Sequence, residues 1–355
     1  MAEQARFANG KDIDRLSNLP DDVICHIISY LPIRETTRTS ILSRRWRYLF
    51  AWTASLTIDF DVDSQSYIGY SFVYKVNKVL FSRRASINKF CLKFKKYIDP
   101  SLVDGWIHYA LSHGVKELEL CFAKYFKFNQ LPSASWLFAC KTLVRLGLKF
   151  RQYFTLEVPD TVRLPNLKVL RLRQIIFSDD ESVQRLFSRC CVLEELVVQR
   201  CIWGRISKFS VSNPTLKRLI LRSLICSNPY QELVINAPSL VYFEHFDLVA
   251  KSYRLLNLQS LVEAVIDIGP IIFTFFYKTA APDLLRGISN IQSLHLGCRF
   301  SKVRIFALIL DLLILHIRFL QLTIEFSFSF EGLSTSSSSQ VPELDLSEDI
   351  YFLLI

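Results

Sequence analysis

The sequence predicts an α/β fold in which a small three-helix module precedes a curved solenoid of short repeats. Three observations lead to this fold class. An apolar hexamer pattern recurs along most of the 355 residues, helical patterns lie between several hexamers, and a run of Leu-Pro pairs and apolar residues precedes the first one. Half of the residues are hydrophobic, which is enough for a large core. We expect three parts, at residues 12–55, 56–300 and 301–355.

The repeats follow the pattern apolar-x-x-apolar-x-apolar, and successive copies begin 21 to 30 residues apart. This period is typical of leucine-rich repeats, in which each repeat contributes one strand and one helix or loop. A single repeat cannot bury its apolar face, so neighbouring repeats stack into a solenoid. The nine hexamers begin at Ile87, Val115, Leu143, Leu167, Leu193, Leu216, Leu240, Leu261 and Ile291, and the copy at Leu240 is the weakest.

Two intervals between hexamers predict helices. In residues 99–114, apolar residues fall on one helical face and the helix ends near Gly114. In residues 178–191, Ser178 and Glu181 have the spacing of a capping box. The apolar faces comprise Leu102, Val103, Trp106, Ile107 and Ala110 in the first helix, and Val183, Leu186, Phe187 and Cys190 in the second.

The N-terminal module, residues 12–55, has a different pattern. Pro20 is placed at the first position of a helix, and the pair Leu31-Pro32 ends that helix. Two further short helices are expected within residues 33–43 and 43–52. Three helices in about 40 residues make a marginal core. We therefore expect some of its apolar residues to face a partner.

The stretch "DRLSNLPDDVICHIISYLPIRETTRTSILSRRWRYLF" closely resembles the F-box motif of plant F-box proteins with leucine-rich repeats. The repeat sequence "LKVLRLRQIIFSDDESVQRLFSRCCVLEELVVQRC", residues 167–201, is similar to the repeats of the same family. The chain resembles the FBD-type members, but residues after 300 do not resemble their strand-rich C-terminal FBD domain.

The resemblance implies a non-catalytic substrate-recognition subunit of an SCF-type (Skp-cullin-F-box) ubiquitin ligase. In that role the F-box docks on a Skp-family adaptor, which links it to a cullin and a RING protein, and the repeats bind an unknown protein target. The residues that the resemblance assigns to the docking surface or its support are Leu19, Pro20, Val23, Ile24, Ile27, Leu31, Pro32, Ile41, Leu42 and Trp46. A leucine-rich-repeat scaffold without ubiquitin transfer is the alternative.

Basic residues follow several hexamers, although the net charge of +10 is mild for this length. Because side chains alternate along a strand, residues beside the apolar positions face the concave side of the solenoid. One interpretation is an ordinary solvated strand face. The other is a groove for an acidic or phosphorylated peptide, or for an inositol phosphate cofactor. The groove candidates are Lys93, Lys95, Lys149, Arg171, Arg173 and Arg222, with Glu119 as an acidic exception.

Other function classes find little support in the sequence. The six His and nine Cys do not have the spacing of metal ligands, and no nucleophile or phosphate-loop motif is present. The scattered Cys residues indicate free thiols in a reducing compartment. We therefore expect the protein to be in the nucleus, the cytoplasm or both. A basic stripe could serve nucleic acid, but no aromatic-plus-basic motif accompanies it, and we expect no nucleic-acid partner.

The C-terminal part, residues 301–355, is atypical. Its Ser tract predicts partial disorder. The apolar run 303–323 is long enough to span a membrane, but it contains Asp311, His316 and Arg318. We therefore expect a buried element and no membrane partner.

Overall fold

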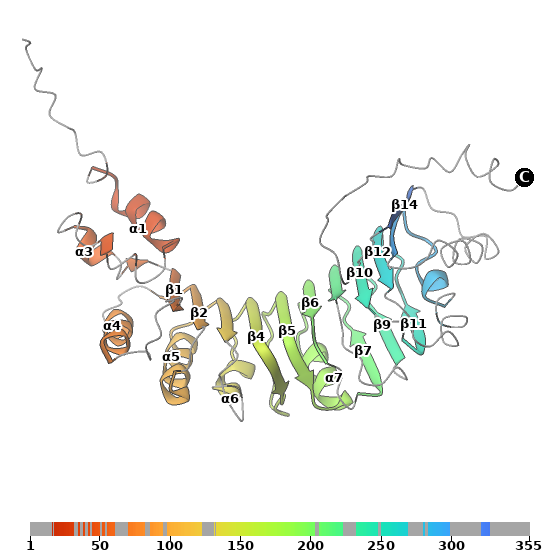
Figure 1. The fold of residues 1–355 in the computed structure, drawn as a ribbon, viewed down its shortest axis with the longest axis horizontal. Coiled ribbons are helices and arrows are strands. Elements are labelled where there is room, and N and C mark those ends of the chain that lie inside the picture. Colours follow the sequence, from red (N-terminus) through yellow and green to blue (C-terminus); the bar gives the residue numbers. More distant parts are fainter. Residues whose placement is uncertain are drawn as a thin grey trace, which may run out of the picture.

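The computed structural model shows helical elements followed by a curved solenoid of parallel strands (Figure 1). Among the residues that it describes, no helix has both the length and the apolar character needed to cross a membrane. Most of the run 303–323 and the predicted disordered tract lie outside the described residues. The described residues are 18–31, 55–60, 70–81, 86–94, 98–122, 133–202, 206–222, 232–247, 250–268, 283–298 and 321–326, with scattered positions beside these spans.

The N-terminal module contains helix α1 (Asp21–Ser29) and the short helix α3 (Trp46–Leu49). Helix α1 begins one residue later than predicted, because Pro20 occupies the N-cap. Within the described part of the module, the helices share a core formed by the buried side chains of Ile24, Ile28, Trp46 and Leu49. Arg45 Nε donates a hydrogen bond of 2.6 Å to Asp21 Oδ1 and so ties the two helices together. The predicted middle helix lies largely outside the described residues.

The main sheet has eleven parallel strands, and each of the nine hexamers contributes one that begins at its third residue. The first, fourth and sixth residues of every hexamer are buried, which explains the sequence pattern. The nine strands are β2 (Lys89–Phe94), β3 (Glu117–Phe122), β4 (Arg145–Leu156), β5 (Val169–Phe177), β6 (Glu195–Gln199), β8 (Arg218–Arg222), β10 (Tyr242–Asp247), β12 (Glu263–Ile268) and β13 (Ser293–Cys298).

Two strands extend this sheet beyond the hexamers. Strand β1 (Ser55–Phe60) pairs with β2 and joins the N-terminal module directly to the solenoid. Strand β14 (Gln321–Phe326) pairs with β13, with Ser293 opposite Gln321. The sheet therefore continues past residue 300, where the sequence analysis ended the repeats. A tenth copy of the pattern, "FLQLTI", begins at Phe319, 28 residues after Ile291, and β14 begins at its third residue. The prediction missed this copy because it overlaps the apolar run 303–323.

The outer layer changes along the solenoid. Helices α4 (Tyr70–Phe81), α5 (Pro100–Ser112), α6 (Ala134–Phe138) and α7 (Asp180–Ser188) lie on the convex side of the earlier repeats (Figure 1). From there on, the described outer elements include β7 (Lys208–Ser212), β9 (Glu232–Asn236) and β11 (Ser252–Leu256). These three strands pair in parallel as a second sheet, in the order β11-β9-β7. The sequence analysis expected a helix or loop in these intervals.

The two predicted helices form, with one correction. Helix α5 buries the predicted face, and Gly114 just beyond its end has a left-handed φ of 74°. Helix α7 also buries Val183, Leu186 and Phe187, but Ser178 is not its cap. The N-cap is Asp179, whose carboxylate accepts a 2.6 Å hydrogen bond from the Ser182 backbone N–H. The capping-box prediction was wrong by one residue, since a carboxylate at the next position caps the same turn.

Candidate functional site

Helix α1 presents an apolar face to solvent beside the face that packs in the small core. The exposed fraction is 42% for Val23, 37% for Ile27 and 74% for Tyr30. These residues are three or four positions apart, so they share one helical face. Leu16, Leu42 and Trp52 are further exposed large apolar residues of the same module. Among the residues of this module that the structure describes, large apolar side chains therefore remain exposed beside the small core.

The structure divides the residues predicted for adaptor docking into two groups. Pro20, Val23, Ile27 and Leu42 are exposed, and Leu19 and Leu31 are half-buried. Ile24 and Trp46 are buried in the core, so they support the surface rather than form it. Pro32 and Ile41 lie outside the described residues. The docking role of all ten stays a prediction.

The concave face of the main sheet is built from three rows of residues, which run across the strands because the strands pair in register. The third residue of each hexamer belongs to the start row and the fifth residue to the middle row. The residue directly after the hexamer belongs to the end row. From β2 to β8 the start row is Lys89, Glu117, Arg145, Val169, Glu195 and Arg218; the middle row is Cys91, Glu119, Gly147, Arg171, Val197 and Ile220; and the end row is Lys93, Cys121, Lys149, Arg173, Gln199 and Arg222.

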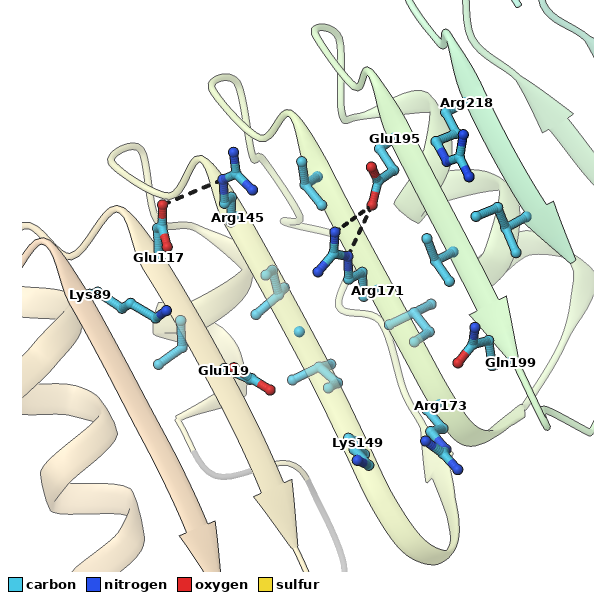
Figure 2. A pocket seen from close by; sticks show the side chains of 18 residues that line it. Lys89, Glu117, Glu119, Arg145, Lys149, Arg171, Arg173, Glu195, Gln199 and Arg218 are labelled. Carbon is cyan, nitrogen blue, oxygen red and sulfur yellow. Dashed lines mark hydrogen bonds and ion pairs between the residues drawn. The ribbon is translucent and has the colours of Figure 1, made fainter. Parts of the chain in front are cut away.

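Several basic residues of this face are neutralised by neighbouring acids. Arg171 Nη2 lies 2.8 Å from Glu195 Oε1 on the adjacent strand. Arg145 Nε lies 3.4 Å from Glu117 Oε1. Arg145 and Arg171 appear in Figure 2 with dashed lines to these partners. The positive charges of both arginines are therefore balanced by carboxylates of the protein itself.

Arg222 is also engaged, at the β10 side of the face. Its guanidinium pairs with Glu244, with Nη2 2.9 Å from Oε2, and this hydrogen bonding raises the pKa of Arg222. Glu244 Oε2 also accepts a 3.1 Å hydrogen bond from the Tyr242 hydroxyl. The Arg218 guanidinium lies 3.7 Å from the centre of the Tyr242 ring, a cation–π contact. Arg171 and Arg222, two of the predicted groove cations, therefore hold neighbouring strands together.

The remaining predicted cations lie in the end row. Lys93, Lys149 and Arg173 form no ion pair with any residue that the structure describes. Lys149 and Arg173 are directly opposite each other on β4 and β5, and Figure 2 shows them side by side. The Nε atom of Arg173 is buried and has no hydrogen-bond partner within the described part of the protein. Lys95 lies outside the described residues.

Arg151 is a further cation at this edge and is not among the predicted groove residues. It follows Lys149 by two residues on the long strand β4, so it lies on the same face. Burial raises the pKa of the Cys121 thiol, while the charges of Lys149, Lys93 and Arg151 act to lower it. Lys93 and Lys149 are directly opposite Cys121 on the two neighbouring strands, and Arg151 is near enough to affect the same thiol. The signal available in the sequence was that β4 alternates for three residues beyond its hexamer.

An open groove of about 580 Å³ lies over strands β2 to β8 (Figure 2). The ion pairs of the start row line one side of it, and Lys149 and Arg173 line the other. Its floor includes the apolar side chains of Val169, Val197 and Ile220. Gly147 stands between Glu119 and Arg171 in the middle row, and the Glu119 side chain lies 3.4 Å from the position that a Cβ would take there. The groove therefore combines an apolar strip with a cationic margin.

Among the described residues, no group of three His, Cys, Asp or Glu side chains is arranged to bind a metal ion. Burial raises the pKa of the Cys91, Cys190 and Cys201 thiols to about 12, so these thiols are not activated nucleophiles. The observed surfaces are suited to binding.

Comparisons with known proteins agree with this arrangement. A family model described as "F-box domain" matches residues 16–55, and one described as "FBD-associated F-box protein At5g56370, LRR repeats" matches residues 103–259. The chain is 36% identical to the F-box/LRR-repeat protein At4g14103 of Arabidopsis thaliana, over 82% of this chain and 79% of that protein. It is 33% identical to the F-box/LRR-repeat protein At3g59190 of the same plant, over 86% and 84%. It is 34% identical to the putative F-box/FBD/LRR-repeat protein At3g59240 of Arabidopsis thaliana, but spans only 58% of that protein.

Proposed function

This chain belongs to the F-box/LRR-repeat proteins, and from that membership we propose that it is the substrate-recognition subunit of an SCF-type ubiquitin ligase. F-box domains in general bind Skp-type adaptors. In the proposed complex, the adaptor links this protein to a cullin and a RING protein, and the solenoid holds the target. The receptor then acts by proximity, because it raises the effective concentration of target lysines near the ubiquitin-loaded E2.

The exposed apolar face of α1 is the single observation that carries the proposal. Val23, Ile27 and Tyr30 project from a helix that Ile24 and Ile28 anchor in the core. An exposed apolar helix face of this kind is suited to contact with a partner protein. The protein needs no catalytic residue in this role, because the transfer chemistry belongs to its partners.

Co-purification of the full chain with a plant Skp-family adaptor tests the proposal. The variant Val23→Asp with Ile27→Asp places two charges in the docking face, and we expect adaptor binding to weaken at least roughly a hundredfold. The matched control is Val241→Asp with Val262→Asp on the solenoid rim. Those two valines are 43% and 37% exposed, almost the same as Val23 and Ile27. The control should bind the adaptor like the wild type.

Two results would contradict the proposal. One is a wild-type chain that does not retain the adaptor. The other is equal loss in the α1 variant and the rim variant, which would mean that any apolar-to-charge change disturbs binding. Thermal unfolding of each variant shows whether the fold is retained.

The same proposal places the protein in the nucleus, the cytoplasm or both. Its support is the state of the cysteines, since all seven that the structure describes are free thiols. Fluorescence microscopy of a tagged chain tests this placement, and a secretory distribution would contradict it.

A further inference from the structure

We propose that the end row near Cys121 binds an extended acidic segment of the target protein, through its carboxylate or phosphate groups. This inference rests on the proposed function, because it names the target chemistry that the solenoid recognises. The site is the cationic cluster Lys93, Lys149, Arg151 and Arg173.

The positive charges of the cluster are not balanced by any described carboxylate of the protein. On the concave face from β2 to β8, Arg145, Arg171 and Arg222 are paired with acids. The four cations of the cluster form no ion pair within the described part of the chain, and Arg173 Nε is buried without a partner there. A guanidinium N–H that has lost contact with solvent favours an anionic acceptor, because charge-assisted hydrogen bonds are the stronger ones.

The cluster is elongated and runs across the strands. Lys93, Lys149 and Arg173 occupy one row, with Cys121 between the two lysines. Neighbouring strands are about 4.8 Å apart, so the row from β2 to β5 spans about 14 Å. An extended peptide rises about 3.4 Å per residue, so a segment of about five residues covers this distance. A single compact anion cannot reach every cation of such a line.

An apolar strip continues the groove beyond the β5 end of the cluster. Val197 and Ile220 lie in the middle row of β6 and β8, so Val197 is the diagonal neighbour of Arg173, and each of the two side chains is 8% exposed. A peptide that places acidic groups along the end row can place an apolar side chain over this strip. Glu119 is the one acid of the middle row from β2 to β8, and it accepts a hydrogen bond from Cys91 Sγ at 3.7 Å, on the side of β2. A nucleic acid has the charge for the end row but offers no aliphatic group for the strip, so a peptide fits better.

Fluorescence polarisation with the full chain tests the inference. The probes are three labelled ten-residue peptides of Gly, Val and a variable residue at every second position, which is phosphoserine, Glu or Ser. We expect the phosphoserine and Glu peptides to bind and the Ser peptide not to bind. In Lys149→Gln with Arg173→Gln, affinity for the acidic peptides should fall at least about tenfold. Lys149→Gln alone is the second variant, and it should lose about half of that effect on a logarithmic scale.

The matched control is Lys116→Gln with Lys141→Gln. These exposed lysines lie at the opposite edge of the sheet and form no ion pair among the described residues, so the control changes net charge equally. It should bind the acidic peptides within twofold of the wild type. Equal losses in both double variants would overturn the proposal, because they would indicate attraction to overall charge.

Two other outcomes would also overturn it. One is tighter binding of a single-stranded oligonucleotide, lost in the same variant, which would assign the cluster to nucleic acid. The other is binding of inositol hexakisphosphate alone, with no affinity for the acidic peptides. Neither outcome affects adaptor docking, which is measured separately, so failure here leaves the proposed function standing.

Discussion

His245 is the one polar residue at a core position of the hexamer pattern. It takes the sixth position in β10, where seven of the other eight strands have Leu or Ile and β6 has Val198. Its Nε2 lies 3.1 Å from the Tyr253 hydroxyl of β11, so it joins the two sheets. Complete burial lowers the pKa of His245 from 6.5 to about 4. The folded protein therefore holds a neutral imidazole that the unfolded chain can protonate.

This lowered pKa predicts a loss of stability in acid. Above about pH 6.5 both states carry neutral His245, and between pH 6.5 and about 4 only the unfolded state takes up the proton. From pH 7.5 to pH 5, the contribution to the unfolding free energy should fall by about 2 kcal/mol. Urea unfolding of His245→Leu should lack this loss, whereas the control His295→Gln, on the concave face, should keep it. An identical pH dependence in wild type and His245→Leu would contradict the assignment.

Among the elements, helix α7 depends on a defined cap. The Asp179 carboxylate accepts hydrogen bonds from the Ser182 N–H at 2.6 Å and from the Ser182 and Ser178 hydroxyls at 2.8 Å. Asp179→Ala should reduce the free energy of unfolding by about 1 kcal/mol or somewhat more, measured by urea unfolding. Glu181→Ala removes a carboxylate from the same turn. The Glu181 side chain is 85% exposed and lies 3.5 Å from the half-buried Arg185, so its loss should change stability by less than about 0.5 kcal/mol. Equal effects would show that general charge, not capping, stabilises the turn.

The elements also show what sequence patterns can and cannot predict. Nine hexamers predicted nine strands, because burial of the first, fourth and sixth residues leaves a direct trace in the sequence. The outer strands β7, β9 and β11 have only five residues each, and such short apolar runs do not distinguish strand from helix or loop. The free and paired cations could not be separated either. Arg171 finds Glu195 24 residues away only because the strands pair in register.

For the whole molecule, the two surfaces lie on different parts of the chain and should fail independently. The variant Val23→Asp with Ile27→Asp should lose the adaptor and keep acidic-peptide binding. The variant Lys149→Gln with Arg173→Gln should do the reverse. Measurement of both activities on both variants forms one experiment, and loss of both activities in either variant would indicate that the surfaces are coupled or the fold is damaged. Ubiquitin transfer to a target should require both surfaces.

The in-register pairing of the main sheet has a consequence for how such a protein can acquire new targets. Residues that hold the core and residues that face the groove never coincide, because they alternate along every strand. Substitutions at the positions of these rows that form no cross-strand ion pair can therefore change the recognised chemistry at little cost in folding. An insertion of one residue within a hexamer would instead turn core residues toward the groove and groove residues toward the core. Specificity in this architecture can evolve by replacement, strand by strand, while changes of length are tolerated only in the connections between strands.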